Sequence, residues 1–515
     1  MEQSTRTIVI SDLHIGTNAP TCWYQKDFHE PYLIRLLAWI LDHKDEIREV
    51  VILGDLLDFW TYPLTHQPPT MDAIVKANPN ILGSDGKLRE VLDTLGGRVV
   101  YLHGNHDINV TQDDLNRIGG AAHKIQLVPD AYVKDDVLYT HGHLSTMFNG
   151  PSPGELPSLP LGYFVTKCIS QMVERDYPGK TAADLPDHGA PYGLDWKKLV
   201  ESRDPSIAAA FLEYIAKVTK VDRDQPIKLL DGAEMSINRA KAVYANLWTE
   251  WVKAFGGELG GETAGEIAAY RAARADYNGS YLGWFVERLR RQRGTRAVVM
   301  GHTHLPRKGL RSKGDSPCSD DVTTISCFSE YYNNGFLCPS RPDVEAGKRF
   351  TFTSLSQEHD GSQIMEVVKK GGSYDVEPLL RPHSAWIVES PSMDYSCYME
   401  VENPTDRDLV RKQPPLASHG YYVAEPPELI PARTRALFWI QDFPGLKGTK
   451  GSVEYAPKSG GRSFTLQYGC PTGLQSNFCN GAPFKSRSGE GRWGKPNQVA
   501  KRGHPFFVTF TIQPT

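Results

Sequence analysis

The chain has 515 residues, of which 40% are hydrophobic, 10% aromatic and 23% charged. This length exceeds one ordinary hydrophobic core, so we expect about two to four domains, and the composition excludes an intrinsically disordered chain. No apolar run approaches the roughly 18 residues that cross a bilayer, which excludes an integral membrane protein. The first residues lack the basic and apolar regions of a secretory signal, so we do not expect classical secretion.

The net charge is −4, which gives no overall argument for nucleic-acid binding. The charge is divided unevenly along the chain. Residues 386–515 hold 15 Lys and Arg against 11 Asp and Glu, a net of +4, which leaves 42 against 50, or −8, for residues 1–385. This larger, acidic part lacks the basic stripe that binding of duplex nucleic acid requires.

The eight cysteines are scattered along the chain, and no two of them form a Cys-x-x-Cys pair. This pattern favours reduced thiols in a cytoplasm over a disulfide framework or a zinc finger. Cys470 and Cys479 are the pair that would join in an exported protein. We therefore expect a cytoplasmic protein, with peripheral association with a membrane as the alternative.

Short apolar runs alternate with helical stretches in residues 1–150. Each run is rich in β-branched residues and apolar on both faces, as expected of a central strand covered by helices on both sides. Residues 28–49 follow the first run and carry leucine and isoleucine at helical spacing, from Leu33 to Leu41. This alternation predicts α/β layers. The apolar runs are residues 7–10, 50–53, 98–102 and 137–139, and a further run lies at 296–300.

Residues 151–295 change to a helical period, with aromatic stripes such as the one from Tyr244 to Trp251. We interpret this segment as a helical insertion within the first domain, and its stripes as core rather than as ligand contacts. Strand-like runs then return, at residues 322–326, 350–353 and 364–368.

A change in composition near Arg381 predicts a boundary, with one domain at residues 1–383 and a second at 384–515. Gly and Pro number 27 of the last 130 residues, against 55 of the 385 before them, so the second domain is rich in turns. Short apolar runs between these turns predict a separate all-β sandwich. The runs are residues 436–440, 464–468 and 506–512.

Polar residues of the kinds that bind metal ions follow every apolar run of the first domain. One such residue after a strand is usually a turn whose polar side chain is satisfied. Five clusters at five strand ends favour a shared site instead, because the carboxyl ends of parallel strands meet at one edge of a sheet. In chain order the clusters are Asp12 and His14; Asp55 and Asp58; His103, Asn105, His106 and Asp107; His141 and His143; and His302 and His304.

The residue types in these clusters indicate the chemistry. Carboxylate, imidazole and amide oxygen ligands without thiolate suit Mn, Fe, Zn or similar divalent ions. There are too many of them for one tetrahedral site, whereas two ions that share a carboxylate would use them all. Such a pair activates water at neutral pH and binds the oxygens of an in-line displacement, so hydrolysis of a phosphoester is the expected reaction.

The motifs resemble those of the calcineurin-like metallophosphoesterases. They are Asp-x-His, Gly-Asp-x-x-Asp, Gly-Asn-His-Asp, His-Gly-His and Gly-His-x-His in this order, and the resemblance covers residues 7–145 and 296–370. It implies an α/β fold, a four-layer αββα sandwich with the insertion as a helical cap. It also implies two divalent metal ions, with Mn favoured and Fe, Zn, Ni or Mg as alternatives.

The same resemblance implies a role for each matching residue. Seven residues would hold the metal ions, and one of them, Asp55, would bridge both. The first ion would be bound by Asp12, His14 and His304, and the second by Asn105, His141 and His302. Catalysis would fall to His106, which with Asn105 would contact the phosphate and would protonate the leaving oxygen, while Asp58 orients its imidazole.

Four further residues have less direct roles in this interpretation. Asp107 and His143 would hold the metal ligands in position without binding the ions themselves. His103 is interpreted as a structural histidine. Arg307, three residues beyond His304, is a candidate contact to the substrate phosphate, with a solvated arginine as the alternative.

Further motifs resemble the UDP-diacylglucosamine hydrolase-like branch of the family. They are Ser11-Asp-Leu-His-Ile-Gly, Gly54-Asp-Leu-Leu-Asp-Phe-Trp and Tyr331-Tyr-Asn-Asn-Gly-Phe. The chain departs from the lipid-A enzymes of that branch at His106, where those carry arginine, which favours general phosphomonoesterase or phosphodiesterase chemistry. The insertion at 151–295 begins soon after His143, so we expect it to cover the metal ions and to set the size of the substrate.

The C-terminal domain resembles the aegerolysin and actinoporin-like β-sandwiches. The cues are Gly448-Thr-Lys-Gly-Ser-Val-Glu-Tyr, Tyr468-Gly-Cys-Pro and the last strand from Phe507. This resemblance implies binding to a lipid head group or a glycan, and a net charge of +4 suits an anionic membrane surface. The alternative is a structural appendage, because surface charge alone specifies no partner.

Taken together, the sequence predicts a two-metal phosphoesterase that hydrolyses a phosphomonoester or phosphodiester by attack of metal-bound hydroxide on phosphorus, with His106 as general acid. Its substrate could be membrane-bound or lipid-linked. One alternative is a catalytically idle scaffold of the same fold that carries a lipid- or glycan-binding module. Another is a nuclease, although we expect no specific nucleic-acid partner. The sequence leaves the oligomeric state open.

Overall fold

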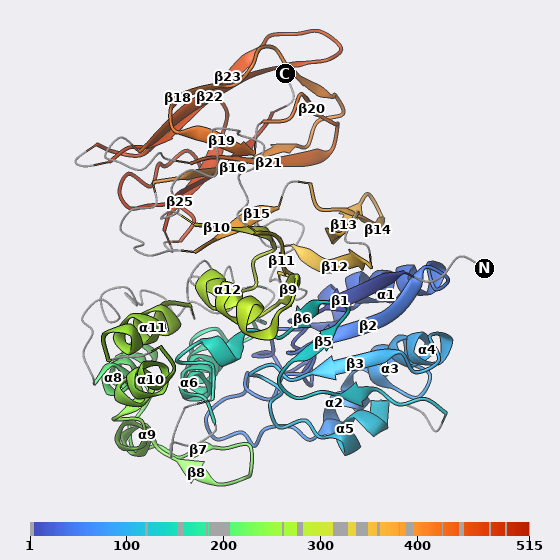
Figure 1. Ribbon diagram of the computed structural model, residues 1–515, viewed down its shortest axis with the longest axis vertical. Helices are drawn as coiled ribbons and strands as arrows, with labels where there is room; N and C mark the ends of the chain where they lie inside the picture. Colours follow the sequence, from blue (N-terminus) through green and yellow to red (C-terminus); the bar gives the residue numbers. More distant parts are fainter. Residues whose placement is uncertain are drawn as a thin grey trace. The chain divides into compact units, whose positions relative to one another are not determined.

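The computed structural model divides into two compact units (Figure 1). The first unit is Met1–Arg307 with Glu330–Pro378, and the second is Lys308–Ser329 with Leu379–Thr515. The strand predicted at 322–326 lies outside the residues that the structure describes. Those residues are 5–118, 122–151, 159–181, 184, 206–259, 262–275, 282–312, 328–335, 349–357, 361–380, 382–387, 395–424, 426–441, 448–472, 475–489 and 492–513.

The first sheet of the first unit runs in the order β14-β13-β12-β1-β2-β3-β4. Strands β1 to β4 are parallel neighbours, and β12, β13 and β14 continue the sheet antiparallel from β1. Val50 pairs with Ile8 on one side and with Val99 on the other, so the predicted apolar runs lie side by side. The strands are β1 (Arg6–Ile10), β2 (Ile47–Leu53), β3 (Val99–Leu102), β4 (Gln126–Leu127), β12 (Phe350–Ser356), β13 (Gln363–Lys370) and β14 (Ser373–Pro378).

A second sheet of this unit contains the path β11-β9-β6-β5. Its central strands β6 and β9 are parallel and fully buried, as their apolar runs predict. On the two sides, β11 pairs parallel with β9, and β5 pairs antiparallel with β6. The strands are β5 (Tyr132–Lys134), β6 (Val137–Tyr139), β9 (Ala297–Met300) and β11 (Phe328–Asn333).

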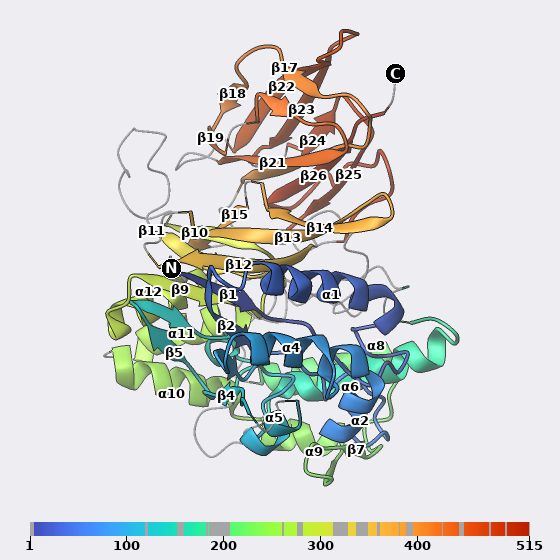
Figure 2. The same cartoon turned by 90° about the vertical axis from the view of Figure 1, so that its right-hand side faces the viewer.

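Helices cover the first sheet, and Figure 2 shows α1 and α4 one beside the other along it. Helix α1 buries Leu33, Leu36, Leu37 and Ile40, which confirms the helical spacing. It ends at Asp42, and β2 begins at Ile47, ahead of the apolar run at residue 50. The helices between the strands are α1 (Lys26–Asp42), α2 (Met71–Ala77), α3 (Pro79–Leu82), α4 (Lys87–Thr94), α5 (Gln112–Ile118) and the 3₁₀ helix η1 (His143–Ser145).

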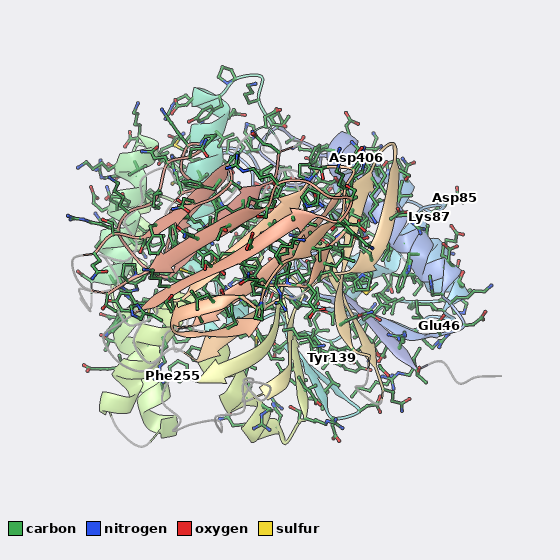
Figure 3. All side chains as sticks on the ribbon, turned by 90° about the horizontal axis from the view of Figure 1, so that it is seen from above. Glu46, Asp85, Lys87, Tyr139, Phe255 and Asp406 are labelled. Atoms are coloured by element: carbon green, nitrogen blue, oxygen red, sulfur yellow. The ribbon has the colours of Figure 1, made fainter. Side chains whose placement is uncertain are left out.

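Where the structure describes it, the segment between β6 and β9 is mainly helical, as predicted, and packs into the same hydrophobic core as the first sheet. Phe211, Trp251 and Phe285 belong to that core, so the aromatic stripes of the segment are packing surfaces where the structure describes them. Figure 3 marks the segment by Phe255 on α10 and the second sheet by Tyr139 on β6. Its elements are α6 (Leu161–Asp176), α8 (Ile207–Thr219), β7 (Ile227–Lys228), β8 (Glu234–Met235), α9 (Ile237–Val243), α10 (Leu247–Leu259), α11 (Glu262–Ala275) and α12 (Leu282–Arg293).

The second unit is rich in strands, and two of its sheets enclose a separate hydrophobic core. One sheet runs β19-β21-β16-β26-β25 and the other β20-β17-β22-β23-β24, with β18 beside β22. Phe438 and Phe510 face the core from the first sheet, and Tyr455 and Leu466 face it from the second. The strands are β10 (Arg307–Ser312), β15 (His383–Ile387), β16 (Cys397–Asn403), β17 (Leu409–Arg411), β18 (Leu416–His419), β19 (Tyr421–Ala424), β20 (Leu429–Ile430), β21 (Thr434–Gln441), β22 (Thr449–Pro457), β23 (Phe464–Cys470), β24 (Phe478–Asn480), β25 (Phe484–Ser488) and β26 (Phe506–Thr511).

These two units confirm the predicted fold class, an α/β sandwich followed by a β-sandwich. Among the described helices, none combines the length and the apolar character needed to cross a bilayer. Cys470 and Cys479, the pair considered from the sequence, are both buried in the second unit and are not joined by a disulfide.

Candidate metal centre

The polar clusters of the first unit lie where its central strands end. Asp12 follows β1 and Asp55 follows β2, while Asn105 follows β3. His141 and His302 follow β6 and β9, the two parallel strands in the middle of the second sheet. Because parallel strands present their carboxyl ends at one edge, the fold brings these side chains together.

The backbone at these strand ends is tightly turned. Five of the predicted ligands adopt left-handed conformations, with φ between 52° and 66°. Such conformations are uncommon for residues other than glycine and concentrate at functional sites. The five residues are Asp12, His14, Asp55, His302 and His304.

Two glycines let the strand-end turns approach the ligand carboxylates. A Cβ atom at Gly301 would lie 2.5 Å from Asp12 Oδ2, and one at Gly104 would overlap Asp55 Oδ1. Any larger residue at either position would displace a carboxylate. The Gly-Asn-His-Asp and Gly-His-x-His motifs therefore need their glycines for space beside a neighbouring strand end.

Asp12, His14 and His304 form the first of the ligand clusters. Their ligand atoms all lie within 4.8 Å of one another. Nε2 of His304 is 3.3 Å from Nε2 of His14 and 3.4 Å from Asp12 Oδ1. Burial and the neighbouring His106 lower the pKa of His14 well below its ordinary value, so its imidazole is neutral and can present a lone pair to a cation.

The second cluster consists of Asp55, His141 and His302, whose ligand atoms also lie within 4.8 Å of one another. Asn105 adds its side-chain oxygen, which is 3.1 Å from Nδ1 of His302. Burial and the neighbouring His141 and His143 lower the pKa of His302 well below its ordinary value. This second imidazole is therefore also neutral and available as a ligand.

Asp55 lies between the two clusters. Its Oδ2 is 3.9 Å from Nε2 of His14, in the first cluster, and 3.3 Å from Nε2 of His141, in the second. Burial acts to raise the pKa of Asp55, but the imidazoles of His141 and His106 outweigh it and hold the pKa well below its ordinary value. The buried Asp55 carboxylate therefore carries a negative charge between the two clusters.

The surroundings of His141 test whether cations fit this site. Its Nδ1 donates to the carbonyl of Leu53 at 2.7 Å, so in the neutral ring Nε2 carries a lone pair that faces the Asp55 carboxylate. Burial acts to lower the pKa of His141, yet the carboxylates of Asp55 and Asp12 raise it to about 9. The site therefore favours positive charge beside Nε2, which a divalent ion would provide.

His106 lies beside both clusters and is held on several sides. Its Nδ1 donates to Asp58 Oδ1 at 3.1 Å, and its backbone N–H donates to Asp55 Oδ1 at 2.8 Å. Burial acts to lower the pKa of His106, but the carboxylates of Asp58 and Asp55 outweigh it and raise the pKa above its ordinary value. The imidazole is therefore able to hold a proton and to give it up.

The Asp58 carboxylate is fixed by its own chain. Its Oδ1 accepts the backbone N–H of Trp60 at 2.8 Å and that of Thr61 at 3.1 Å, and its Oδ2 accepts the Thr61 hydroxyl at 2.9 Å. The carboxylate is fully buried and ends with one oxygen facing His106. Such fixed partners orient an imidazole and determine which nitrogen carries the proton.

Asp107 and His103, both close to His106 in the sequence, serve the loop that carries it. The Asp107 carboxylate accepts the backbone N–H of Gly104 at 2.7 Å and the hydroxyl of Tyr101. Nε2 of His103 bonds the carbonyl of Val110 at 2.7 Å. Both side chains thus bond the backbone of the loop that carries His106.

His143 and Arg307 are the two remaining candidates. The His143 ring is buried 5.3 Å from that of His141, and burial and His141 lower the pKa of His143 to about 3. Arg307 is buried at the start of β10, where its charge acts on Tyr331.

Sequence analysis singled out the segment from Tyr331 without assigning it a task, and the structure shows what its asparagines do. Asn333 donates from Nδ2 to the carbonyl of Gly301 at 2.7 Å, and Asn334 donates to Ser11 Oγ at 3.2 Å. Ser11 in turn bonds the carboxylate of Asp12. The two buried amides therefore brace the turns that carry ligands after β9 and β1.

Two tryptophans of the site were not predicted as functional residues. Trp60 stacks on His106, with ring centroids 4.4 Å apart and planes inclined by 23°. Trp23 lies 4.6 Å from His14 and 4.9 Å from His106 by ring centroids. Trp60 belongs to a motif quoted above for the family branch, whereas Trp23 stands in a loop without any recognisable pattern.

A sequence model of the calcineurin-like phosphoesterase family matches residues 5–306, which is more than half of the chain. The chain therefore belongs to the calcineurin-like phosphoesterases, a family of hydrolases that use divalent metal ions. The two ligand clusters agree with this membership, because each offers carboxylate and imidazole groups that can hold such an ion. A search of the curated proteins finds no match to the chain.

Proposed function

We propose that the chain is a two-metal phosphoesterase that hydrolyses a phosphomonoester or a phosphodiester. The observation that carries this proposal is the position of Asp55 Oδ2, which faces His14 of one ligand cluster and His141 of the other. One ion would be held by Asp12, His14 and His304, the second by Asn105, His141 and His302, and both by Asp55. Mn is the favoured ion, with Fe, Zn, Ni or Mg as alternatives.

The protein's own residues then position the substrate and move a proton. Bound divalent ions would supply positive charge to the phosphoryl oxygens and activate water at neutral pH. His106, beside both clusters and oriented by Asp58, would donate its proton to the oxygen of the departing alcohol. Asn105 and His106 would also contact the phosphate. In an in-line displacement the departing oxygen lies opposite the attacking water, so its proton donor must lie on that side. The imidazole of His106, beside both ligand clusters, can serve there.

Residues 151–295 are proposed to act as a cap that limits the size of the substrate. Helix α6 of this segment is fastened to the loop that follows Asp58. Lys167 on α6 donates to the carbonyls of Pro63 and His66, at 3.3 Å and 2.9 Å. Burial lowers the pKa of Lys167 to about 7, so this contact holds α6 without requiring a full charge in the interior.

The UDP-diacylglucosamine hydrolase-like branch is proposed on the motifs around Asp12, Asp55 and Tyr331. The bracing role of Asn333 and Asn334 gives the last of these motifs a physical reason. His106 stands where the lipid-A enzymes carry arginine, so the proposal extends to the branch and its general chemistry, not to their substrate.

For the second unit we propose an aegerolysin- or actinoporin-like module that recognises a lipid head group or a glycan, with peripheral association of a cytoplasmic protein with a membrane. The net charge of +4 in residues 386–515 supports attraction to an anionic surface. Lys495, Lys501 and Arg502, which lie close together in the sequence before β26, are all exposed.

A hydrolysis panel tests the proposed activity. The chelated chain is assayed with nitrophenyl phosphate and bis-nitrophenyl phosphate, alone and after addition of Mn, Fe, Zn, Ni or Mg. We expect hydrolysis that depends on the added metal and is abolished by Asp55→Asn. Absence of hydrolysis with every metal would favour an idle scaffold, and preference for DNA or RNA over small diesters would favour a nuclease of the same fold.

A further inference from the structure

Trp23 lies against imidazoles that belong to the metal site and to the proposed acid. Its indole centroid is 4.6 Å from the ring of His14, 4.9 Å from that of His106 and 5.7 Å from that of His304. The planes are inclined by 65°, 45° and 88°, so none of these three rings stacks parallel to the indole. A ligand held between the metal ligands and His106 would therefore lie beside this indole.

Trp23 is one of the partly exposed residues of the site, as are His304 and His302. The side chain of His304 is 28% exposed and Trp23 is half-buried, whereas the side chains of Asp55 and His141 are at most 1% exposed. A phosphoester that enters beside the exposed part of His304 would pass the indole, which lies 5.7 Å from that ring. The group attached to its phosphoryl group would then lie beside Trp23.

The loop around Trp23 is fastened on both sides of the indole. Gln25 Nε2 donates to the carbonyl of Cys22 at 2.7 Å, within the loop. Thr21 donates from its hydroxyl to the carbonyl of Thr61 at 2.6 Å. Thr61 in turn donates its hydroxyl to Asp58, the carboxylate that orients His106. Trp23 is thus held in place before any substrate arrives, which lowers the entropic cost of using it as a contact surface.

We propose that Trp23 is a specificity-determining residue, which packs on a ring carried by the departing alcohol of the substrate. This inference rests on the proposed function, because it takes His106 as the donor to that alcohol. Since the indole lies next to His106, it faces the departing group. A large aromatic surface favours a partner with a flat face, either an aromatic ring or the apolar face of a sugar, over a flexible alkyl chain.

The test compares departing alcohols that differ in their ring and not in their acidity. Benzyl, glucose-6-yl and butyl phosphates all release a primary alcohol, so each needs the proton of His106 to a similar degree. Each is offered as the monoester or as its methyl diester, whichever the enzyme hydrolyses. We expect kcat/KM for the benzyl or the glucosyl ester to exceed that of the butyl ester. Whichever of the two ring esters does so identifies the kind of ring that Trp23 prefers.

Variants of Trp23 assign this preference to the indole. Trp23→Ala is expected to lower kcat/KM for the preferred ring ester by about 3- to 10-fold more than for the butyl ester, as the loss of one ring contact implies. Trp23→Phe keeps a ring and should retain most of the preference. Trp39→Ala is the matched control, because Trp39 packs outside the site, on His43 and Phe352.

Binding provides a readout that does not depend on turnover. Calorimetry compares benzylphosphonate and a glucose 6-phosphonate with butylphosphonate, in the wild type and in Trp23→Ala whose metal content is verified. The inference is supported if Trp23→Ala weakens the binding of the ring phosphonate more than the binding of butylphosphonate. Equal losses for all ligands would make Trp23 a general wall of the site and overturn it, as would the absence of any ring preference in the wild type. If ring phosphonates bind selectively and no ester is hydrolysed, the proposed activity fails and the contact made by Trp23 stands.

Discussion

The imidazole of His106 stacks on the indole of Trp60, at 4.4 Å between ring centroids. Trp60 also donates its backbone N–H to Asp58 Oδ1, the same oxygen that accepts the proton of His106 Nδ1. His106, Asp58 and Trp60 therefore contact one another, and each of them helps to hold the other two in place. Because Trp60 is fully buried, this group is anchored in the core of the first unit.

His106→Ala is expected to keep the metal ions and to slow hydrolysis of alkyl esters by about 10²–10⁴-fold, because the departing alkoxide then receives no proton from the protein. Nitrophenyl esters should lose much less, since nitrophenolate departs without a proton. The rates of both ester types are measured together with metal content. An equal loss for both would mean that His106 binds phosphate and does not act as an acid.

Asp55→Asn is expected to abolish turnover and to loosen both metal ions together. The carboxylate faces His14 of one cluster and His141 of the other, and its charge offsets the repulsion between two cations. Metal analysis of the dialysed variant should show the loss of more than one equivalent. Asp93→Asn, which changes an exposed carboxylate on α4, is the matched control and should keep both. Retention of two equivalents in Asp55→Asn would refute the bridging role.

Asn334→Ala is expected to weaken metal binding without removing a ligand. Asn334 links Ser11, which bonds Asp12, to the hydroxyl of Thr353 on β12, at 3.2 Å and 2.5 Å. Loss of such a support typically costs about 10–100-fold in metal affinity. Competition with a chelator measures the change. Asn80→Ala removes an exposed amide that bonds Glu30 and should leave the metal affinity as in the wild type. Unchanged affinity in Asn334→Ala would make the amide purely structural.

The sequence predicted the centre of the fold well, because buried parallel strands leave a strong pattern. Runs such as 50–53 are apolar on both faces, and a ligand such as Asp55 follows directly, so strand and ligand could be recognised together. Helix α1, from Lys26 to Asp42, extends on both sides of the predicted spacing from Leu33 to Leu41, and β2 begins at Ile47, ahead of its apolar run. Element ends depend on pairing with neighbours, which a single segment does not reveal.

The surroundings of the ligands were harder to predict. Trp23 lies in a loop, where no periodicity marks which face meets the site. Asn334 was part of a recognised motif, but its task depends on Ser11, more than 300 residues away in the chain. The left-handed conformation of His14, with a φ of 52°, is likewise not marked by the local sequence. Contacts of this kind arise from tertiary packing, which local propensities do not encode.

Association of the second unit with a membrane surface is tested on the full chain. We expect the protein to sediment with anionic vesicles at low salt and to be released at high salt, because screening weakens attraction between exposed charges. Vesicles of phosphatidylcholine alone are the reference and should bind little. Sedimentation that ignores both vesicle charge and salt would contradict an electrostatic contribution.

Charge reversal locates the surface responsible. The triple variant Lys495→Glu, Lys501→Glu and Arg502→Glu changes three exposed basic residues of the second unit. At about 1 kcal/mol for each basic residue near an anionic surface, it should lose roughly 100-fold or more in vesicle affinity. The matched control reverses three exposed lysines of the first unit, Lys44, Lys76 and Lys217, and thus makes the same change in net charge. Hydrolysis of small soluble esters should be unchanged in both variants, because none of the six residues belongs to the metal centre. Equal loss of vesicle binding in the two would show that net charge, and not the second unit, governs the association.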